Sequence, residues 1–190
     1  MSGGVDSSLT AALLIEQGYD VIGVTMTLSD ESREAGGSTA VSDAKKVADA
    51  LNIPHYVVNY HKKFKDDVIK YFISEYAKGR TPNPCVRCNN TVKFGSLLKD
   101  CLELGADCVA TGHYARIEQD EKTGRYLLKK GLDVRKDQSY VLYTLTQDVL
   151  KHFMLPLGNY SKEKTRELAG KMNLPVANKP EKSGDLFYSK

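Results

Sequence analysis

The sequence contains no run of apolar residues long enough to cross a membrane, and its first residues lack the basic start of a signal peptide. It has only four cysteines, which without a secretory signal are expected to be reduced thiols in the cytoplasm. A second C-x-x-C pair and a paired-histidine motif are also lacking, and a structural zinc site needs four ligands. These absences predict a cytoplasmic protein with no membrane partner and disfavour structural zinc.

The composition is that of a globular protein, with 190 residues of which 41% are hydrophobic and 27% are charged. This length suffices for one domain with a small appendage and a hydrophobic core. Charge is unevenly placed, because residues 1–60 carry three Lys and Arg against eight Asp and Glu, whereas residues 61–190 carry 24 against 16. A basic second half is compatible with a nucleic-acid partner, although a solvated lysine-rich surface explains it equally simply.

The chain opens on a glycine turn, M-S-G-G-V-D-S-S, followed by an amphipathic run that ends at Gly18. Gly3 and Gly4 permit close approach of a phosphate, and the free N–H groups of a helix N-terminus favour an anion. No lysine follows, so this is not a Walker A loop, whose lysine contacts the phosphates beside a transferred γ-group. The turn suits an enzyme that holds pyrophosphate as a leaving group while a substrate atom attacks the α-phosphorus.

Hydrophobic periodicity predicts alternating helices and strands. The expected helices are residues 7–17, 41–51, 64–78, 92–104, 137–152 and 161–172, and the expected strands are 19–28, 55–59, 107–111 and a hairpin of 114–118 with 126–130. Such alternation predicts an α/β fold, a doubly wound parallel sheet with helices on both faces. Ligands of these sheets sit at the carboxyl ends of strands, where Met26 and Gly112 are expected. A phosphate loop of this type normally follows a strand, so we expect the first strand of the sheet to be missing from this sequence.

A second informative stretch runs from Gly79 to Asn89 and contains C-x-x-C at Cys85 and Cys88. Its two prolines predict a loop over residues 80–90, and the neighbouring Arg80 and Arg87 are expected to lower the thiol pKa values. By itself, one C-x-x-C is compatible with three kinds of site: half of a zinc site, a redox-active cysteine pair, or ligands of an iron–sulfur cluster. Cys101 and Cys108 fall in a helix and a strand and are most simply core residues.

The opening S-G-G-V-D-S-S resembles the pyrophosphatase loop (PP-loop) of the ATP pyrophosphatase superfamily. The later motifs T-P-N-P-x-x-x-C-N, A-T-G-H-Y-A and G-L-D-x-x-K-D-Q-S-Y resemble the tRNA-specific 2-thiouridylase family in order and spacing. The resemblance implies an adenine nucleotide alpha hydrolase-like fold and a tRNA-uridine 2-sulfurtransferase that acts on the anticodon wobble uridine. ATP with Mg²⁺ would adenylate the C2 oxygen, and a cysteine persulfide, loaded by a sulfur donor or carrier protein, would deliver sulfur.

The resemblance also implies roles for individual residues. The catalytic residues would be Cys88, Cys85 and Asp6. The ATP-binding residues would be Met1, Ser2, Gly3, Gly4, Val5, Asp6, Ser7, Ser8, Met26 and Gly112. The tRNA-binding residues would be Asn83, Pro84, Cys85, His113, Lys136, Asp137 and Gln138. Residues 1–133 would form the nucleotide-binding domain and residues 134–190 a partial helical tRNA-binding subdomain.

Two departures from the family pattern bear on the sulfur chemistry. Cysteine at position 85 resembles the family version suspected of binding an iron–sulfur cluster, [4Fe-4S], with Cys85 and Cys88 as two of three protein ligands. Aligning K-P-E puts Leu186 where the family's later cysteine belongs, and the family's C-terminal β-barrel is not present. We therefore expect a shortened member whose sulfur chemistry rests on Cys85 and Cys88, on an externally completed cluster, or is lost.

Three hypotheses follow from these motifs. The first is ATP-dependent tRNA 2-thiolation, the second a small-molecule ATP pyrophosphatase in which the cysteines are incidental, and the third a non-catalytic remnant that binds ATP or tRNA. The tRNA-facing motifs K-D-Q-S-Y and P-N-P-C-V-R-C favour the first over the second. Leu186 and the missing strand favour the third over the first. The ordered set of motifs makes the first hypothesis our prediction.

Overall fold

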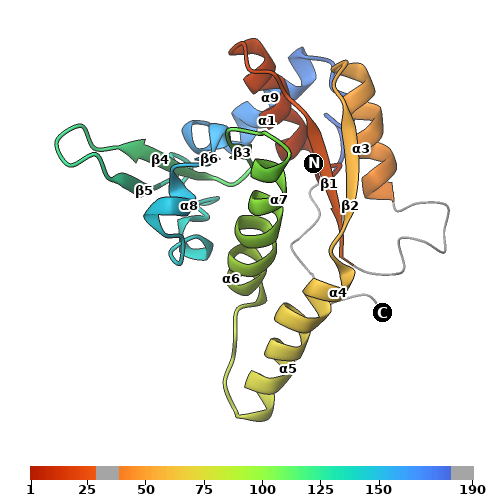
Figure 1. Ribbon diagram of the computed structural model, residues 1–190. Coiled ribbons are helices and arrows are strands. Elements are labelled where there is room, and N and C mark those ends of the chain that lie inside the picture. The colour runs from red at the N-terminus through yellow and green to blue at the C-terminus, as the bar shows by residue number, and fades with distance from the viewer. Residues whose placement is uncertain (29–38, 181–190) are drawn as a thin grey trace.

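The computed structural model describes residues 1–28 and 39–180, which form an α/β fold with parallel strands and helices on both faces, as predicted (Figure 1). Residues 29–38 and 181–190, the latter including Leu186, lie outside the described residues. The division of the chain at residue 133 stays a prediction. No helix within the described ranges has both the length and the apolar character needed to cross a membrane.

The helices match most of the predicted spans. In chain order, the helical segments are α1 (Val5–Glu16), α3 (Thr39–Ala50), α4 (His61–Phe64), η1 (Lys65–Ile69), α5 (Lys70–Ala77), α6 (Pro84–Cys88), η2 (Asn89–Leu97), α7 (Leu98–Glu103), η3 (Ser139–Val141), α8 (Gln147–Leu150), η4 (Pro156–Asn159) and α9 (Lys162–Lys171). Segments η1 and η2 are π-helical turns that continue their neighbours, so two long helical rods result, 61–77 and 84–103. Segments η3 and η4 are 3₁₀ turns.

The strands form three pairs. Strand β1 (Gly23–Thr27) runs parallel to β2 (His55–Asn59), β3 (Val109–Ala110) runs parallel to β6 (Phe153–Met154), and β4 (Ala115–Gln119) is antiparallel to β5 (Tyr126–Lys130). Within the described ranges the two parallel pairs are not hydrogen-bonded to each other. On β1, the carbonyl of Val24 accepts a hydrogen bond from the Met1 ammonium, whose pKa is lowered to about 6 by burial.

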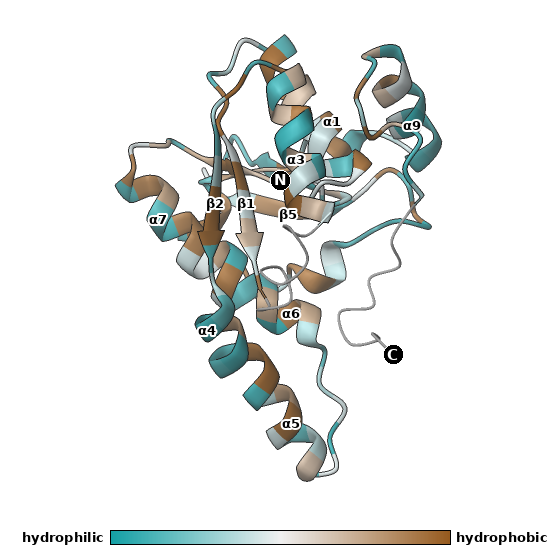
Figure 2. Ribbon diagram, turned by 90° about the vertical axis from the view of Figure 1, so that its right-hand side faces the viewer, coloured by the Kyte–Doolittle hydropathy of each residue, from teal (hydrophilic) through white to brown (hydrophobic). Residues whose placement is uncertain are grey.

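Hydrophobic side chains of β1 and β2 pack against those of the two helical rods. Figure 2 colours stretches of β2, α5 and α7 as hydrophobic. One face of β1 and β2 contributes Met26 and Val58 to a cluster with Phe64, Val68 and Cys88 from the rods. Helix α3 packs on the same strand pair and buries Ala44, Val47 and Ala48. The strand pair is therefore covered by helices from both sides, as Figure 1 shows.

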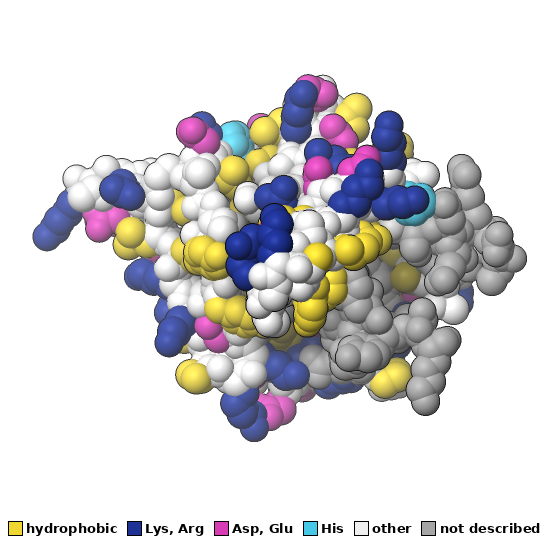
Figure 3. Space-filling view, turned by 90° about the horizontal axis from the view of Figure 1, so that it is seen from below, with side chains coloured by type: hydrophobic (Ala, Val, Ile, Leu, Met, Phe, Trp, Pro, Cys, Tyr) yellow, Lys and Arg dark blue, Asp and Glu magenta, His cyan; other side chains and the backbone are white. Residues whose placement is uncertain are grey.

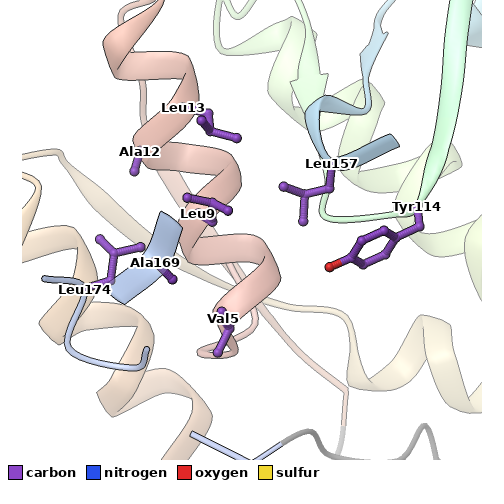
Figure 4. Close-up of a cluster of buried hydrophobic side chains, with 8 residues drawn as sticks. All are labelled: Val5, Leu9, Ala12, Leu13, Tyr114, Leu157, Ala169 and Leu174. Carbon is purple, nitrogen blue, oxygen red and sulfur yellow. The ribbon is translucent and has the colours of Figure 1, made fainter. Parts of the chain in front are cut away.

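A second cluster joins the two ends of the described chain (Figure 4). Helix α1 contributes Leu9 and Leu13, helix α9 contributes Ala169, and Leu157 lies fully buried between them and Tyr114. Burying such side chains stabilises the fold by about 1.5–3 kcal/mol each. This packing fixes the start of α9 beside the glycine turn. Lys162 of α9 and Asp6 of the turn are 156 residues apart in sequence but are hydrogen-bonded to each other.

The predicted loop over residues 80–90 is wrong from residue 84 onward, because α6 begins there. The side chain of Asn83 caps this helix by accepting from the N–H groups of Cys85 (2.9 Å) and Val86 (3.3 Å). Pro84 occupies the first helical position, where its missing N–H costs nothing. Both cysteines of the C-x-x-C therefore lie on a helix, three residues apart.

The predicted helix over residues 137–152 is also wrong. Asp137 accepts from the backbone N–H groups of Gly131 (2.9 Å) and Ser139 (3.3 Å), which ends regular structure before the short turn η3. The chain then forms α8 and the short strand β6, whose Phe153 is buried against Phe94. Pairing with β3 thus replaces the expected helix.

The predicted helix 64–78 begins earlier, at His61, and its far end is not buried. Phe64 and Val68 face the core, but Tyr76 is 54% exposed and Ile73 is 61% exposed. These side chains lie at the lower end of the molecule, where hydrophobic and basic groups are neighbours on the surface (Figure 3). Hydrophobic periodicity thus predicted the helix, but only its first part packs into the core.

Candidate phosphate loop and cysteine helix

The glycine turn leads directly into the first turn of α1. Gly3 has φ +68, a left-handed conformation that glycine adopts at little cost, and an added Cβ there would collide with the Ala40 carbonyl oxygen. Gly4 is the N-cap, and no side chain in the described part of the chain caps the helix. Ser7 Oγ instead accepts from the Ser2 N–H (3.0 Å), which closes the turn. The uncapped first-turn N–H groups and the helix dipole make this turn suitable for an anion.

Asp6 is held by two residues that sequence reasoning missed. The Tyr114 hydroxyl donates to Asp6 Oδ1 (3.0 Å), and the Lys162 ammonium donates to both carboxylate oxygens (2.7 and 2.8 Å). Tyr114 lies in the recognised A-T-G-H-Y-A motif, so a signal for it existed. Lys162 follows the helix cap Ser161, and nothing in the local sequence connects it to the glycine turn.

A second lysine, Lys179, also reaches the turn. Its ammonium donates to the Gly3 carbonyl (2.8 Å) and to Asp43 on α3 (2.5 Å), and this pairing lowers the pKa of Asp43. Lys179 opens the K-P-E sequence, so the motif used for alignment does contact the predicted site. The glycine turn is therefore bracketed by two lysines from the C-terminal part of the described chain.

The segment after β3 lies directly against the glycine turn. A Cβ at Gly112 would lie 2.9 Å from Asp6 Cβ and 3.2 Å from the Ser7 nitrogen, closer than such contacts normally are. The structure thus brings Gly112 and the turn together, and their shared role in ATP binding stays a prediction. Met26, predicted for the same site, packs against the cluster that contains Tyr60 and Phe64.

His113 follows Gly112 and faces the cysteine-bearing rod. Its ring centroid lies 5.8 Å from that of Phe94 on η2, and its Nδ1 lies 2.8 Å from the Thr111 hydroxyl. Burial lowers the pKa of His113 to about 3, with the charge of Lys93 adding to the effect. The imidazole is therefore neutral near pH 7, and it can exchange hydrogen bonds but carries no positive charge for a phosphate.

The two cysteines differ in their surroundings. Cys88 is buried with Val68 and Val92, whereas Cys85 is half-buried against the neighbouring cluster that contains Val141. Burial raises the pKa of Cys88 above its ordinary value of 9.0, and the charge of Lys93 offsets this only partly. The prediction that neighbouring arginines lower the thiol pKa is wrong for Cys88.

The reason lies in where the two arginines point. The guanidinium of Arg80 pairs with Glu75, and that of Arg87 lies 4.9 Å from the centre of the Tyr71 ring. The Arg87 Nε also donates to the Asp67 carbonyl (3.0 Å). Both positive charges are thereby directed at the other helical rod.

The K-D-Q segment touches both halves of the candidate site. The Gln138 N–H donates to the Tyr114 carbonyl (2.8 Å), and the side-chain oxygen of Gln138 accepts from the Tyr114 N–H (3.0 Å). Just beyond it, the Val141 carbonyl accepts from the side-chain amide of Asn89 (3.2 Å), the residue after Cys88. The side-chain oxygen of Asn89, Oδ1, is buried and has no hydrogen-bond partner within the described residues. Asp6, Tyr114, Gln138 and Asn89 thus link the glycine turn to the cysteine helix.

Metal binding depends on which ligand side chains the fold brings together. Among the described residues, no group of three or more His, Cys, Asp or Glu side chains could hold a metal ion. Cys85 and Cys88 alone supply two of the three protein ligands expected for a [4Fe-4S] cluster, so this part of the chain does not fit the cluster. A carboxylate suited to Mg²⁺ is present at Asp6, where Lys162 neutralises it.

A hollow of about 420 Å³ opens beside Lys162. It is lined by Asp133, Arg135, Lys136, Lys162, Glu163 and Arg166, which together carry an excess of positive charge. Lys136, which we predicted to contact tRNA, thus shares a surface with the lysine that reaches Asp6.

Known proteins resemble this chain over nearly its whole length. A family model described as "tRNA methyl transferase HUP domain" matches residues 1–189. The "tRNA-specific 2-thiouridylase MnmA 1" of Caldanaerobacter subterraneus is 59% identical over 98% of this chain and 54% of its own length. The "tRNA-specific 2-thiouridylase MnmA" of Clostridioides difficile is 54% identical over 98% of this chain and 54% of its own length. The chain thus spans about half the length of the curated relatives it matches.

Solved structures with the same fold are more distant in sequence. A predicted subunit of tRNA methyltransferase from Methanocaldococcus jannaschii superposes with a TM-score of 0.53 at 18% identity, covering 89% of this chain and 72% of its own. The NMN synthetase of Francisella tularensis superposes with a TM-score of 0.51 at 18% identity, covering 95% and 63%. These two likenesses support the α/β fold alone. The match over residues 1–189 shows that the chain belongs to the family described as the tRNA methyl transferase HUP domain, in which its curated relatives are named tRNA-specific 2-thiouridylases.

Proposed function

We propose that this chain provides the ATP-dependent part of 2-thiolation of a tRNA wobble uridine. The single observation that carries the proposal is the continuous contact from Asp6 through Tyr114 and Gln138 to the turn held by Asn89 beside Cys88. An anion-binding turn, a neutral imidazole and a thiol pair come from three separate motifs. A reaction that uses ATP and then sulfur on one base needs these groups around one site.

In the proposed first step, the glycine turn binds the β- and γ-phosphates of ATP. The C2 oxygen of uridine attacks the α-phosphorus, a C2–O–P bond forms, and the bond to pyrophosphate breaks. Mg²⁺ at Asp6 would neutralise the leaving pyrophosphate when it is bound. The helix dipole and first-turn N–H groups of α1 stabilise the same negative charge without needing to reorganise.

In the proposed second step, sulfur replaces the activated oxygen. A hydrosulfide ion, or the terminal sulfur of a persulfide on Cys88, attacks C2, and the C2–O bond breaks with loss of AMP and the sulfur proton. In the persulfide route, the Cys85 thiolate attacks the Cys88 sulfur and breaks the S–S bond, and an external dithiol then reduces the resulting disulfide. The two cysteines are three residues apart on α6 and so lie on one side of the helix, where the charge of Cys85 adds to the rise in the pKa of Cys88.

The target base is proposed to lie in the anticodon loop of tRNA. Single-stranded loop bases are recognised through stacking and hydrogen bonds to their edges. Amide, imidazole and lysine groups at Gln138, His113 and Lys136 have the donors and acceptors for this, and His113 stays neutral at pH 7. A sulfur donor or carrier protein is the remaining proposed partner.

The proposal is tested by incubating the chain with tRNA, ATP, Mg²⁺, a persulfide sulfur donor and a dithiol reductant, and analysing tRNA nucleosides by mass spectrometry. We expect 2-thiouridine and AMP in equal amounts. Cys88→Ser should abolish 2-thiouridine while ATP binding persists. Cys101→Ser is the control and should remain active, because Cys101 is also buried in the same cluster but lies outside the C-x-x-C. Full activity of Cys88→Ser would exclude Cys88 from sulfur transfer, and AMP without 2-thiouridine would favour a different ATP pyrophosphatase.

A further inference from the structure

Lys162 is a largely buried lysine beside the glycine turn. Its side chain is 12% exposed, its ammonium lies 5.5 Å from the centre of the Tyr114 ring, and it contacts both oxygens of Asp6. Asp6 is the second residue of α1, so the ammonium lies beside the uncapped first-turn N–H groups. A positive charge and an anion-binding helix start are thereby placed together.

The position of Lys162 is fixed from two sides. Its backbone N–H donates to Asp133 Oδ2 (3.0 Å), and Ser161 caps the same helix start by accepting from the Lys164 N–H (3.1 Å). Helix α9 in turn packs on α1 through the buried Ala169 and Leu9. The distance from Lys162 to the glycine turn is therefore set by the hydrophobic core, and surface flexibility does not control it.

The glycine turn itself lacks the lysine that other phosphate loops carry. A pyrophosphate leaving group is a polyanion and needs cations nearby. Of the two lysines that bracket the turn, Lys179 binds the Gly3 carbonyl and Asp43, which are parts of the scaffold. Lys162 instead binds the one carboxylate that the proposed function gives to Mg²⁺.

We infer that Lys162 is a pyrophosphate-binding residue of this site, supplied by α9 in place of a lysine within the loop. The inference rests on the proposed function and adds an exchange of partners to it. Without nucleotide, Lys162 neutralises Asp6. When ATP and Mg²⁺ bind, Asp6 turns to the metal ion and the Lys162 ammonium moves to a β- or γ-phosphate oxygen, so each charge keeps a counter-charge throughout.

The inference is tested by titrating the chain with magnesium pyrophosphate and with MgATP in a calorimeter. Lys162→Met should weaken both affinities roughly tenfold to hundredfold, the range of a charge-assisted hydrogen bond. Lys162→Arg keeps the positive charge and should recover much of the affinity. Lys164→Met is the matched control, because Lys164 lies on the same helix start but pairs with Glu167. It should bind like the unaltered chain.

Three outcomes separate the possibilities. If the unaltered chain binds neither ligand, the proposed function and this inference both fall. If it binds both and Lys162→Met binds them equally well, only the inference is overturned and the lysine is a structural partner of Asp6. If Lys162→Met unfolds, Lys162→Gln replaces it, because glutamine keeps a donor for Asp6 but has no charge. Weaker binding of both ligands by Lys162→Gln supports the inference, and unchanged binding overturns it.

Discussion

The Tyr114 hydroxyl donates to Asp6 Oδ1 at 3.0 Å and lies 3.1 Å from the Thr165 hydroxyl, so one phenol joins three segments that are far apart in sequence. Asp6 belongs to the glycine turn, Tyr114 follows β3, and Thr165 lies fully buried on α9. The hydroxyl thus stabilises the start of α1 against both of its neighbours. The aromatic ring packs in the same cluster as Leu9 and Leu157.

Removing this hydroxyl tests its contribution to the fold. Tyr114→Phe keeps the ring in the core and leaves Thr165 without this partner, which should lower the free energy of unfolding by about 1–2 kcal/mol. Urea denaturation measures the change. Tyr143→Phe is the control, since Tyr143 is 70% exposed and its substitution should alter stability by less than about 0.5 kcal/mol. Equal stability of the two variants would show that the Tyr114 hydroxyl is energetically unimportant.

Gly112→Ala tests the close packing of the segment after β3 on the glycine turn. The added Cβ would lie 2.9 Å from Asp6 Cβ, so backbone must move and stability should fall by about 1–3 kcal/mol. ATP affinity should fall as well, because the backbone that the added Cβ pushes against belongs to the first turn of α1. Gly170→Ala provides the contrast, because nothing lies within 4 Å of its added Cβ and an exposed helix position should gain up to about 1 kcal/mol. The idea fails if both alanine variants are stabilised.

The pH dependence of Cys88 alkylation tests its ionisation. Burial raises the pKa of Cys88 above 9.0, so the native thiol stays protonated at pH values where an unfolded cysteine has begun to ionise. Because only the thiolate reacts, its alkylation by iodoacetamide should rise with pH to beyond pH 9 and trail the denatured chain throughout. Peptide mass spectrometry follows the site. A rate that levels off below pH 8 would mean that nearby positive charge stabilises the thiolate after all.

Asp6→Ala tests the carboxylate at the helix start. If Asp6 orients magnesium-bound pyrophosphate, the variant should lose ATP-dependent adenylation, which is followed as AMP released in the presence of tRNA. Asp49→Ala is a suitable control, because Asp49 lies exposed on α3 and pairs only locally with Lys45. Normal AMP formation by Asp6→Ala would reject the proposed role, and the carboxylate would then serve as a structural partner of Lys162 and Tyr114.

Local signals in the sequence were enough for much of the fold. The strand at His55–Asn59 has the predicted limits, and Gly105, with φ +90, follows the second helical rod as a C-terminal glycine should. Ser161, the first residue of the predicted helix 161–172, caps α9. Each of these features depends on residues within one or two turns of chain, which a sequence displays directly.

Features that depend on distant contacts were not predictable in the same way. The helix at Pro84 was missed because a proline at the first helical position and one inside a loop look alike without the Asn83 cap. The strand at Phe153 forms only because Val109 is available to pair with it. Likewise, Lys162 reaches Asp6 through the packing of α9 on α1, which no spacing in the sequence specifies.

The central claim is that the glycine turn binds the phosphates of ATP, and equilibrium binding of MgATP to the chain tests it most directly. The comparison is between the unaltered chain and Gly3→Val, in which the side chain would collide with the Ala40 carbonyl and strain a residue with φ +68. Gly79→Val is the matched control, with φ +73 and open space around it. The account predicts saturable binding by the unaltered chain and by Gly79→Val, and its loss in Gly3→Val while the fold is retained. Equal binding by all three proteins, or no binding by the unaltered chain, would contradict it.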